Sequence, residues 1–217
     1  MVILSITAKS KRMYEVKTDG ESFVLTAEEL YRFGLHETAP LSERDRSEIP
    51  TLEVPEETGQ EIYASLRKRA LAKSGDLLKN QDYSRKKLME KLILAGFPSS
   101  VAEETVRSLE DAHYVDDLRL AVSYVRCHLS DKSRARILND LMKKGISEET
   151  SGEALAEVLE EEGGEDALLK KETEQIQMLL TKRHYDPETA DFHEKQKTMA
   201  FLYRKGFPAD LIRQVMR

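Results

Sequence analysis

From about residue 59 onward, apolar residues recur at the spacing of helices that bury one face. Leu88, Leu92 and Ala95 illustrate the pattern, because they fall on one stripe of a helix whose other positions are mostly polar. Three segments then end alike, in an apolar run, a glycine and a second large apolar residue. The glycine pairs are Gly96-Phe97, Gly145-Ile146 and Gly206-Phe207. A glycine at this place takes the left-handed conformation and lets the next apolar side chain fold back on the helix.

The glycines follow one another after 49 and then 61 residues, which is typical of stacked supersecondary units. We therefore predict a mainly α fold of three tandem three-helix repeats, over residues 59–115, 116–162 and 163–217. The expected helix N-caps are Ser84, Ser100 with Glu103, Asp116, Ser147, and Asp186 before Pro187. A unit of this size buries little apolar surface alone, so neighbouring repeats must share surface in an elongated, curved array.

The first residues follow a different pattern, that of short strands. Apolar and polar residues alternate around residues 13–17, and Asp19-Gly20 suits a type I′ hairpin turn before a further apolar run. Thr26 with Glu29 forms a capping box that starts a short helix. We predict a small β-rich module over 1–37, followed by a linker over 38–58 that is rich in proline and acidic residues.

Composition adds limits on location. The chain has 217 residues, 34% of them charged, and a single cysteine, Cys127, which cannot form an internal disulfide and fits a reducing cytosol. The uncharged run at the start, residues 1–8, is too short to cross a bilayer. We expect a cytoplasmic protein without a membrane anchor. The Cys127-His128 pair is interpreted as a helix-buried cysteine beside a surface histidine.

Patterns of catalytic chemistry do not occur in the sequence. It has no phosphate-binding glycine loop, no pair of histidines at metal-binding spacing, and no carboxylate pair in an apolar setting. We expect no enzymatic activity, no cofactor and no metal.

Charge is unevenly distributed around the formal net value of −6. Residues 1–60 carry 7 basic and 12 acidic side chains, residues 61–150 carry 17 and 14, and residues 151–217 carry 10 and 14. The first two repeats therefore hold the basic clusters. The candidate contact residues are Arg85, Lys86, Lys87, Lys91, Lys132, Arg134, Arg136, Lys143 and Lys144.

Each basic cluster taken alone suits a solvated helix face, but the clusters recur at equivalent repeat positions. A basic group at a helix N-terminus opposes the helix dipole, whereas a phosphate there is favoured, so these clusters suit sequence-independent phosphate contacts. Four tyrosines could stack on bases, although buried tyrosines with satisfied hydroxyls are the favoured interpretation. They are Tyr83, Tyr114, Tyr124 and Tyr203.

Residues 82–125, which read DYSRKKLMEKLILAGFPSSVAEETVRSLEDAHYVDDLRLAVSYV, resemble the RecX family of bacterial recombination regulators. Arg134, Ile137, Leu141, Lys144 and Gly145 follow in the family's order. The similarity extends over about residues 60–217. One departure is the segment 130–133, where family members usually have a glycine, often followed by proline.

The resemblance implies tandem three-helix repeats and a non-enzymatic regulator of homologous recombination and DNA repair, including the SOS response. Family members bind the RecA nucleoprotein filament and DNA. We therefore expect a monomer that binds the RecA filament and, weakly, single- or double-stranded DNA, and that inhibits ATP hydrolysis and strand exchange. The resemblance leaves a stimulatory sign open. Two alternatives are a DNA-binding helical module without a recombinase partner and a protein-interaction solenoid that never touches DNA.

Overall fold

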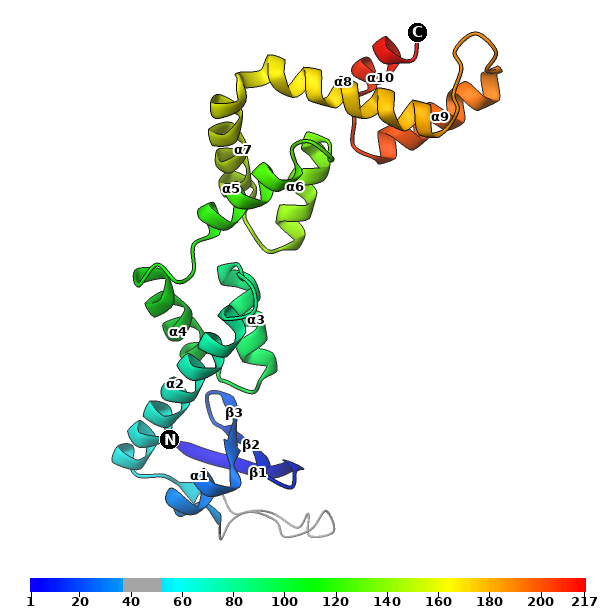
Figure 1. Ribbon diagram of the computed structural model, residues 1–217. Coiled ribbons are helices and arrows are strands. Elements are labelled where there is room, and N and C mark those ends of the chain that lie inside the picture. The colour runs from blue at the N-terminus through cyan, green and yellow to red at the C-terminus, as the bar shows by residue number, and fades with distance from the viewer. Residues whose placement is uncertain (37–51) are drawn as a thin grey trace. The chain divides into compact units, whose positions relative to one another are not determined.

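A computed structural model describes residues 1–36 and 52–217 of the chain (Figure 1). These residues form ten helices and one four-stranded antiparallel sheet, which confirms the predicted fold class. They divide into two compact units, Met1–Val115 and Asp116–Arg217. The predicted domain boundaries stay predictions, and most of the predicted linker, residues 38–51, lies outside the described residues.

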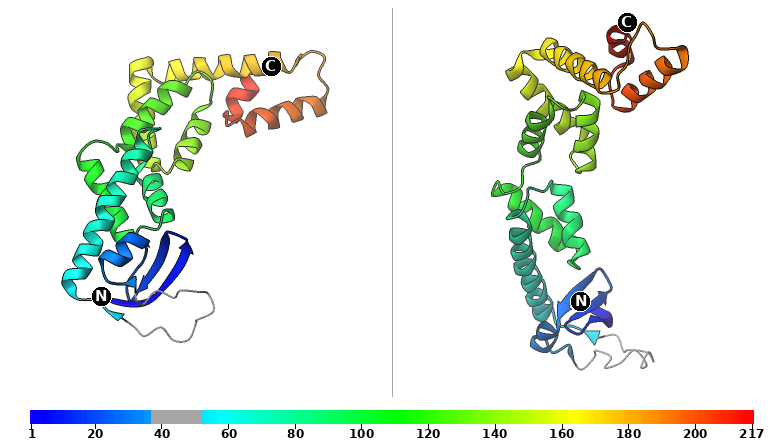
Figure 2. Two further views of the ribbon diagram at one scale, coloured as in Figure 1. Left: turned by 60° about the horizontal axis from the view of Figure 1, so that its bottom comes forward. Right: turned by 45° about the vertical axis from the view of Figure 1, so that its right-hand side comes forward.

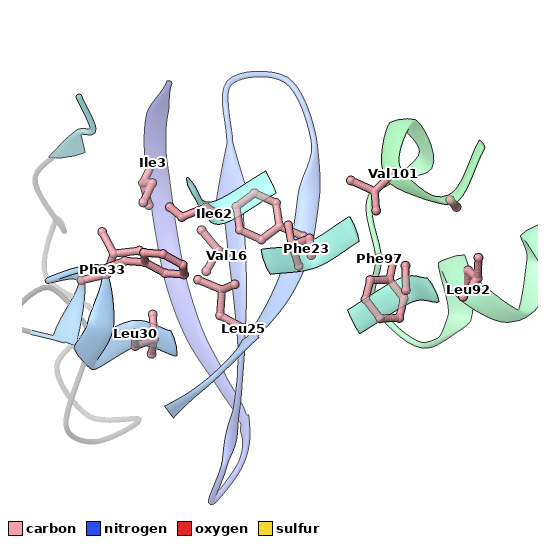
Figure 3. Packing of buried hydrophobic residues seen from close by; sticks show 14 of the residues in the cluster. Ile3, Val16, Phe23, Leu25, Leu30, Phe33, Ile62, Leu92, Phe97 and Val101 are labelled. Atoms are coloured by element: carbon pink, nitrogen blue, oxygen red, sulfur yellow. The ribbon is translucent and has the colours of Figure 1, made fainter. Parts of the chain in front are cut away.

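The sheet consists of β1 (Val2–Ser10), β2 (Met13–Thr18), β3 (Ser22–Thr26) and β4 (Leu52–Glu53), in the order β3-β2-β1-β4. Ile6 pairs with Val16, and Val16 pairs with Phe23, so these three side chains form one row across a single face. All three are buried in the same cluster as Ile62 and neighbouring helical residues. Figure 3 shows Val16 and Phe23 together with Ile62. The sheet lies beside α2 in all views (Figure 2).

One sequence expectation for this module differs from the structure. Neither Asp19 nor Gly20 has a left-handed backbone, so the hairpin turn is not type I′. The Thr18 hydroxyl closes the turn instead, because it accepts the amides of Gly20 and Glu21 and donates to the Glu21 carbonyl. The capping box of Thr26 and Glu29 at the start of α1 (Ala27–Arg32) is present as predicted.

The first repeat comprises α2 (Glu56–Leu78), α3 (Arg85–Leu94) and α4 (Ser99–Asp111). The predicted linker continues to residue 58, but Leu52 and Glu53 form β4 against β1 and α2 begins at Glu56. Ser84 caps α3 as predicted. Ser100 is not an N-cap: α4 begins one residue earlier, after Pro98, and the Ser100 hydroxyl and amide bind the carboxylate of Glu21.

The second unit carries the other six helices of the described chain. They are α5 (Asp117–His128), α6 (Arg134–Lys143), α7 (Glu148–Glu162), α8 (Gly164–Lys182), α9 (Phe192–Arg204) and α10 (Ala209–Val215). Asp116 and Ser147 cap α5 and α7 as predicted. Asp186 does not start a helix, because its carboxylate closes a local turn with Glu188 and Thr189, and Asp191 caps α9.

The three glycine turns share one hydrogen-bonding pattern. Gly96, Gly145 and Gly206 have φ angles of 91°, 86° and 92°. Each glycine amide donates to the carbonyl three residues earlier, and the following amide donates to the carbonyl five residues before it. This is the Schellman arrangement, and it buries Phe97, Ile146 and Phe207. The glycine and apolar residue therefore end the second helix of each repeat in the same way.

The sheet module packs on the first repeat through this turn. The Val24 amide donates to the Gly96 carbonyl over 2.8 Å, and a Cβ on Gly96 would collide with the Val24 side chain. On α2, the Arg69 guanidinium donates to the Glu29 carboxylate over 2.6 Å and to the Val24 carbonyl over 3.1 Å. These contacts join strand β3, α1 and the first repeat into one unit.

Candidate functional site

The basic residues of α3 form the first candidate contact surface. Arg85, Lys86 and Lys87 occupy the first turn, directly after the Ser84 cap. Arg85 forms an ion pair with Glu110 of α4 at 3.3 Å, and Lys87 forms one with Glu90 at 2.7 Å. The hydrogen bond from Lys87 lowers the pKa of Glu90. Lys86 and Lys91 are exposed and form no ion pair within the part of the chain that the structure describes. The charge of Lys86 nevertheless helps to lower the pKa of Glu90.

The basic residues of α6 and of the turn before it converge on a single carboxylate, Asp140. Its oxygens lie 3.1 Å from Lys132, 3.4 Å from Arg136 and 4.0 Å from Lys143. Burial acts to raise the pKa of Asp140, but hydrogen bonds from Lys132 and Tyr124 outweigh it and lower that pKa. Much of the positive charge in this cluster is therefore compensated within the repeat.

The remaining candidates of the second repeat also have intramolecular partners. The Arg134 side chain forms an ion pair with Glu165 of α8 at 3.0 Å. The ammonium groups of Lys132 and Lys144 lie 4.9 and 5.2 Å from the centre of the Tyr124 ring. Surface ion pairs are weak, at about 0–1 kcal/mol, so an anionic partner can displace these carboxylates at little cost. The α3 candidates belong to the first unit and the α6 candidates to the second.

A polar junction between the second and third repeats was not predicted from the sequence. The Ser133 hydroxyl caps α6 and donates to the carbonyl of Lys205, over 2.7 Å, at the end of α9. From α8, buried Glu172 accepts the amide of Arg134, and buried Gln175 donates to the carbonyls of Leu129 and Lys132. The sequence offered one signal for this junction, Ser133, a serine at a capping position in the segment 130–133. The sequence did not reveal its partner, the carbonyl of Lys205, which lies 72 residues away.

Several side-chain expectations are wrong. Cys127 is exposed rather than buried, and the adjacent His128 ring packs on Tyr124 with its Nδ1 3.2 Å from Asp131. Tyr114 and Tyr203, expected to be buried, are 67% and 68% exposed. Each of these residues lies in a helix or turn with one solvent-exposed face. Apolar periodicity does not decide whether a residue at the edge of that face is buried or exposed.

The described ranges 1–36 and 52–217 contain neither a metal-binding cluster nor a membrane-spanning helix. No group of three or more His, Cys, Asp or Glu side chains there could hold a metal ion. None of the helices in these ranges is both long and apolar enough to cross a bilayer.

Comparison with known proteins identifies the repeats. A family model described as the second three-helix domain of RecX matches residues 116–155, and one described as the third three-helix domain matches residues 171–216. These matches begin at the start of α5 and within α8, so both fall on the helical repeats of the second unit.

Curated relatives extend the similarity to the first unit. The chain is 29% identical to "Regulatory protein RecX" of Clostridioides difficile (strain 630), and the similarity covers 93% of this chain and 86% of that protein. It is 29% identical to the protein of that name from Neisseria meningitidis serogroup A, over 70% of this chain and 90% of the relative. A solved structure, "Crystal structure of regulatory protein RecX", matches the fold with a TM-score of 0.60, at 22% identity, over 98% of this chain and 97% of the other. The chain thus belongs to the RecX family of regulatory proteins.

Proposed function

We propose that this chain is a non-enzymatic regulator of homologous recombination and DNA repair that binds the RecA nucleoprotein filament. In this proposal it inhibits ATP hydrolysis and strand exchange by the filament. Membership of the RecX family, whose curated members are named regulatory proteins, is the observation that carries the proposal. The tandem repeats support it, because repeated units suit a partner that is itself built from repeated subunits.

Lys86 and Lys91 are the primary contacts in this proposal. Both are exposed on α3 and form no ion pair with a described residue, so binding to a phosphate or an acidic side chain displaces no ion pair. Arg85, Lys87, Lys132, Arg134, Arg136, Lys143 and Lys144 are secondary contacts. Most of these exchange an intramolecular partner for the filament, so each contributes less net free energy.

The alternative function is a DNA-binding helical module without a recombinase partner. Its support is the position of three basic residues on the first turn of α3, where the helix dipole also favours a phosphate. The net charge of −6 favours the filament over bare DNA, because long-range attraction to a polyanion is weak for an acidic protein.

The deciding experiment measures ATP hydrolysis by RecA on single-stranded DNA during titration with the full chain. We expect the rate to fall, and the variant K86E/K91E to require a higher concentration for the same effect. The matched control K195E/K197E makes an equal charge change at exposed positions of α9, outside the proposed contacts, and should behave as the wild type. An unchanged rate at stoichiometric excess would overturn the proposal. Co-sedimentation with bare and RecA-coated DNA over a salt series separates the two functions, because only the DNA-binding module should show no preference for the coated DNA.

A further inference from the structure

A groove of about 640 Å³ lies within the second unit, where the turn between α5 and α6 faces α8 and α9. Its lining comes from residues 130–136, 175–182 and 201–207. None of the candidate contacts on α3 borders it. The groove is therefore a separate surface from the proposed primary contacts.

Positive charge dominates the groove. Five basic side chains line it against one acidic side chain, Asp131; the basic residues are Lys132, Arg136, Lys182, Arg204 and Lys205. Lys132 and Arg136 share Asp140, which leaves their charge partly compensated. Lys182 and Arg204 are exposed and have no ion pair with any residue that the structure describes. An anionic ligand would meet two uncompensated cations here.

Apolar surface lies among these cations. Met178 is 56% exposed, and Leu179, Phe201 and Phe207 also line the groove. The Lys205 ammonium lies 5.7 Å from the centre of the Phe201 ring. The groove thus offers apolar contact next to positive charge, and a ligand that is only anionic would leave the apolar part uncovered.

The amide of Gln175 supplies a third feature. Its Nε2 donates to two backbone carbonyls, which fixes the orientation of the group, and its Oε1 is buried without a hydrogen-bond partner. Gln175 also lines the groove and is 6% exposed. An unsatisfied buried acceptor costs free energy, and a ligand that brings an N–H donor would remove that cost.

We propose that this groove binds a short acidic peptide segment of a partner protein, one that carries an apolar side chain next to its carboxylates. Such a segment supplies anions for Lys182 and Arg204, an apolar group for Met178 and Phe201, and a backbone N–H for Gln175. The inference does not require that the partner be a recombinase.

Charge favours a short peptide over a nucleic acid. Residues 116–217 carry 17 basic and 20 acidic side chains, so the unit that holds the groove is acidic as a whole. A short segment experiences mainly the charges within one Debye length, about 8–10 Å, which here are the groove cations. A nucleic acid that leaves the groove meets the surrounding acidic surface.

The test measures fluorescence anisotropy of a dye-labelled peptide, Asp-Leu-Asp-Phe-Glu-Glu, titrated with the full chain at near-physiological salt. We expect saturable binding that weakens about tenfold in K182E/R204E and in Met178→Ser, and that is unchanged in K195E/K197E. A matched peptide with Ser in place of Leu and Phe should bind more weakly. All variants change exposed side chains, and circular dichroism would verify their folding.

Three outcomes would overturn the proposal. One is equal affinity of the wild type and K182E/R204E for the peptide. Another is equal affinity for the apolar and the serine peptides. The last is binding of a single-stranded oligonucleotide that depends on Lys182 and Arg204, together with no binding of the peptide. A failure of the ATP hydrolysis experiment leaves this test unaffected, because the two use different residues and different readouts.

Discussion

A Cβ atom on Gly206 would lie only 2.6 Å from the Oγ atom of Ser133, a distance that real Cβ contacts do not reach. The two residues are joined further by the hydrogen bond from Ser133 to the carbonyl of Lys205, the residue before the glycine. The turn that ends α9 is thus fitted against the first turn of α6. Gly206 has two requirements at once, a left-handed backbone and no side chain.

Substituting Gly206 by alanine should therefore destabilise the second unit by about 1–3 kcal/mol, because an L-residue is strained at positive φ and its methyl group meets Ser133. Urea denaturation followed by circular dichroism measures the change. The control is Gly152→Ala within α7, where nothing lies within 4 Å of an added Cβ and φ is not left-handed. Alanine there should stabilise by about 0.5–1 kcal/mol. Equal effects at the two glycines would show that the close fit does not exist in solution.

Ser133→Ala should cost more than Ser147→Ala. Both hydroxyls cap a helix by accepting the amide at the third helical position, so both variants lose about 1 kcal/mol from the cap. Only Ser133 also donates to a carbonyl of the next repeat, which adds about 0.5–1.5 kcal/mol. Chemical denaturation of the two variants side by side tests the difference. Indistinguishable stabilities would mean that the inter-repeat hydrogen bond contributes nothing.

Arg69→Met should loosen the sheet module from the first repeat. The side chain of Glu29 is 9% exposed, and removing Arg69 leaves its carboxylate with hydrogen bonds from Thr26 and Ser65 but no cationic partner among the described residues. We expect a loss of about 1–3 kcal/mol and faster amide hydrogen exchange in β3. Arg67, two residues before Arg69 on α2, forms an exposed ion pair with Glu104, and Arg67→Met should cost under about 1 kcal/mol. A similar loss of stability in both variants would contradict the conclusion that Arg69 joins the sheet module to the first repeat.

Glu172 predicts a pH dependence of stability. Burial raises its pKa in the folded protein, with the Arg134 amide acting in the opposite direction. Its contribution to stability is therefore fully present below the ordinary glutamate pKa and is lost as pH rises through the raised value. Glu172→Gln keeps an acceptor for the Arg134 amide and cannot ionise, so its free energy of unfolding relative to the wild type should increase from acid to neutral pH.

Denaturation of Glu172→Gln at a series of pH values tests this direction, and Glu162 offers a control of opposite sign. A hydrogen bond from Lys171 lowers the pKa of Glu162, so its contribution is present above the ordinary glutamate pKa and lost as pH falls. Glu162→Gln should therefore lose stability relative to the wild type as pH rises. Parallel pH profiles for the two variants would refute the role of burial at Glu172.

Local signals in the sequence predicted the repeats well, because the features involved are local in the structure. Gly96, Gly145 and Gly206 end their helices through hydrogen bonds within six residues, and Ser84 begins α3 through a bond within four. Ser100 was mispredicted because a distant group, the Glu21 carboxylate, binds it. Asp186 was mispredicted because a capping side chain closes a simple turn equally well.

The candidate contact surface was predictable only in composition. The sequence located the basic residues, but not the carboxylates that compensate them, since Arg134 and Glu165 are 31 residues apart. The groove between α8 and α9 was missed for the same reason. Lys182 ends α8 and Arg204 ends α9, and the packing of these two helices with the turn between α5 and α6 brings both side chains to one cavity.

The contact between Val24 and Gly96 has a consequence for how the repeat series begins. The turn of the third repeat is covered by the second repeat through Ser133, and the turn of the first repeat is covered by strand β3. The sheet therefore occupies the place that a preceding repeat would fill. The glycine turn of the first repeat is therefore covered within its own unit. Loss of this module should uncover the Gly96 turn and leave the Gly96 carbonyl without the Val24 amide that donates to it.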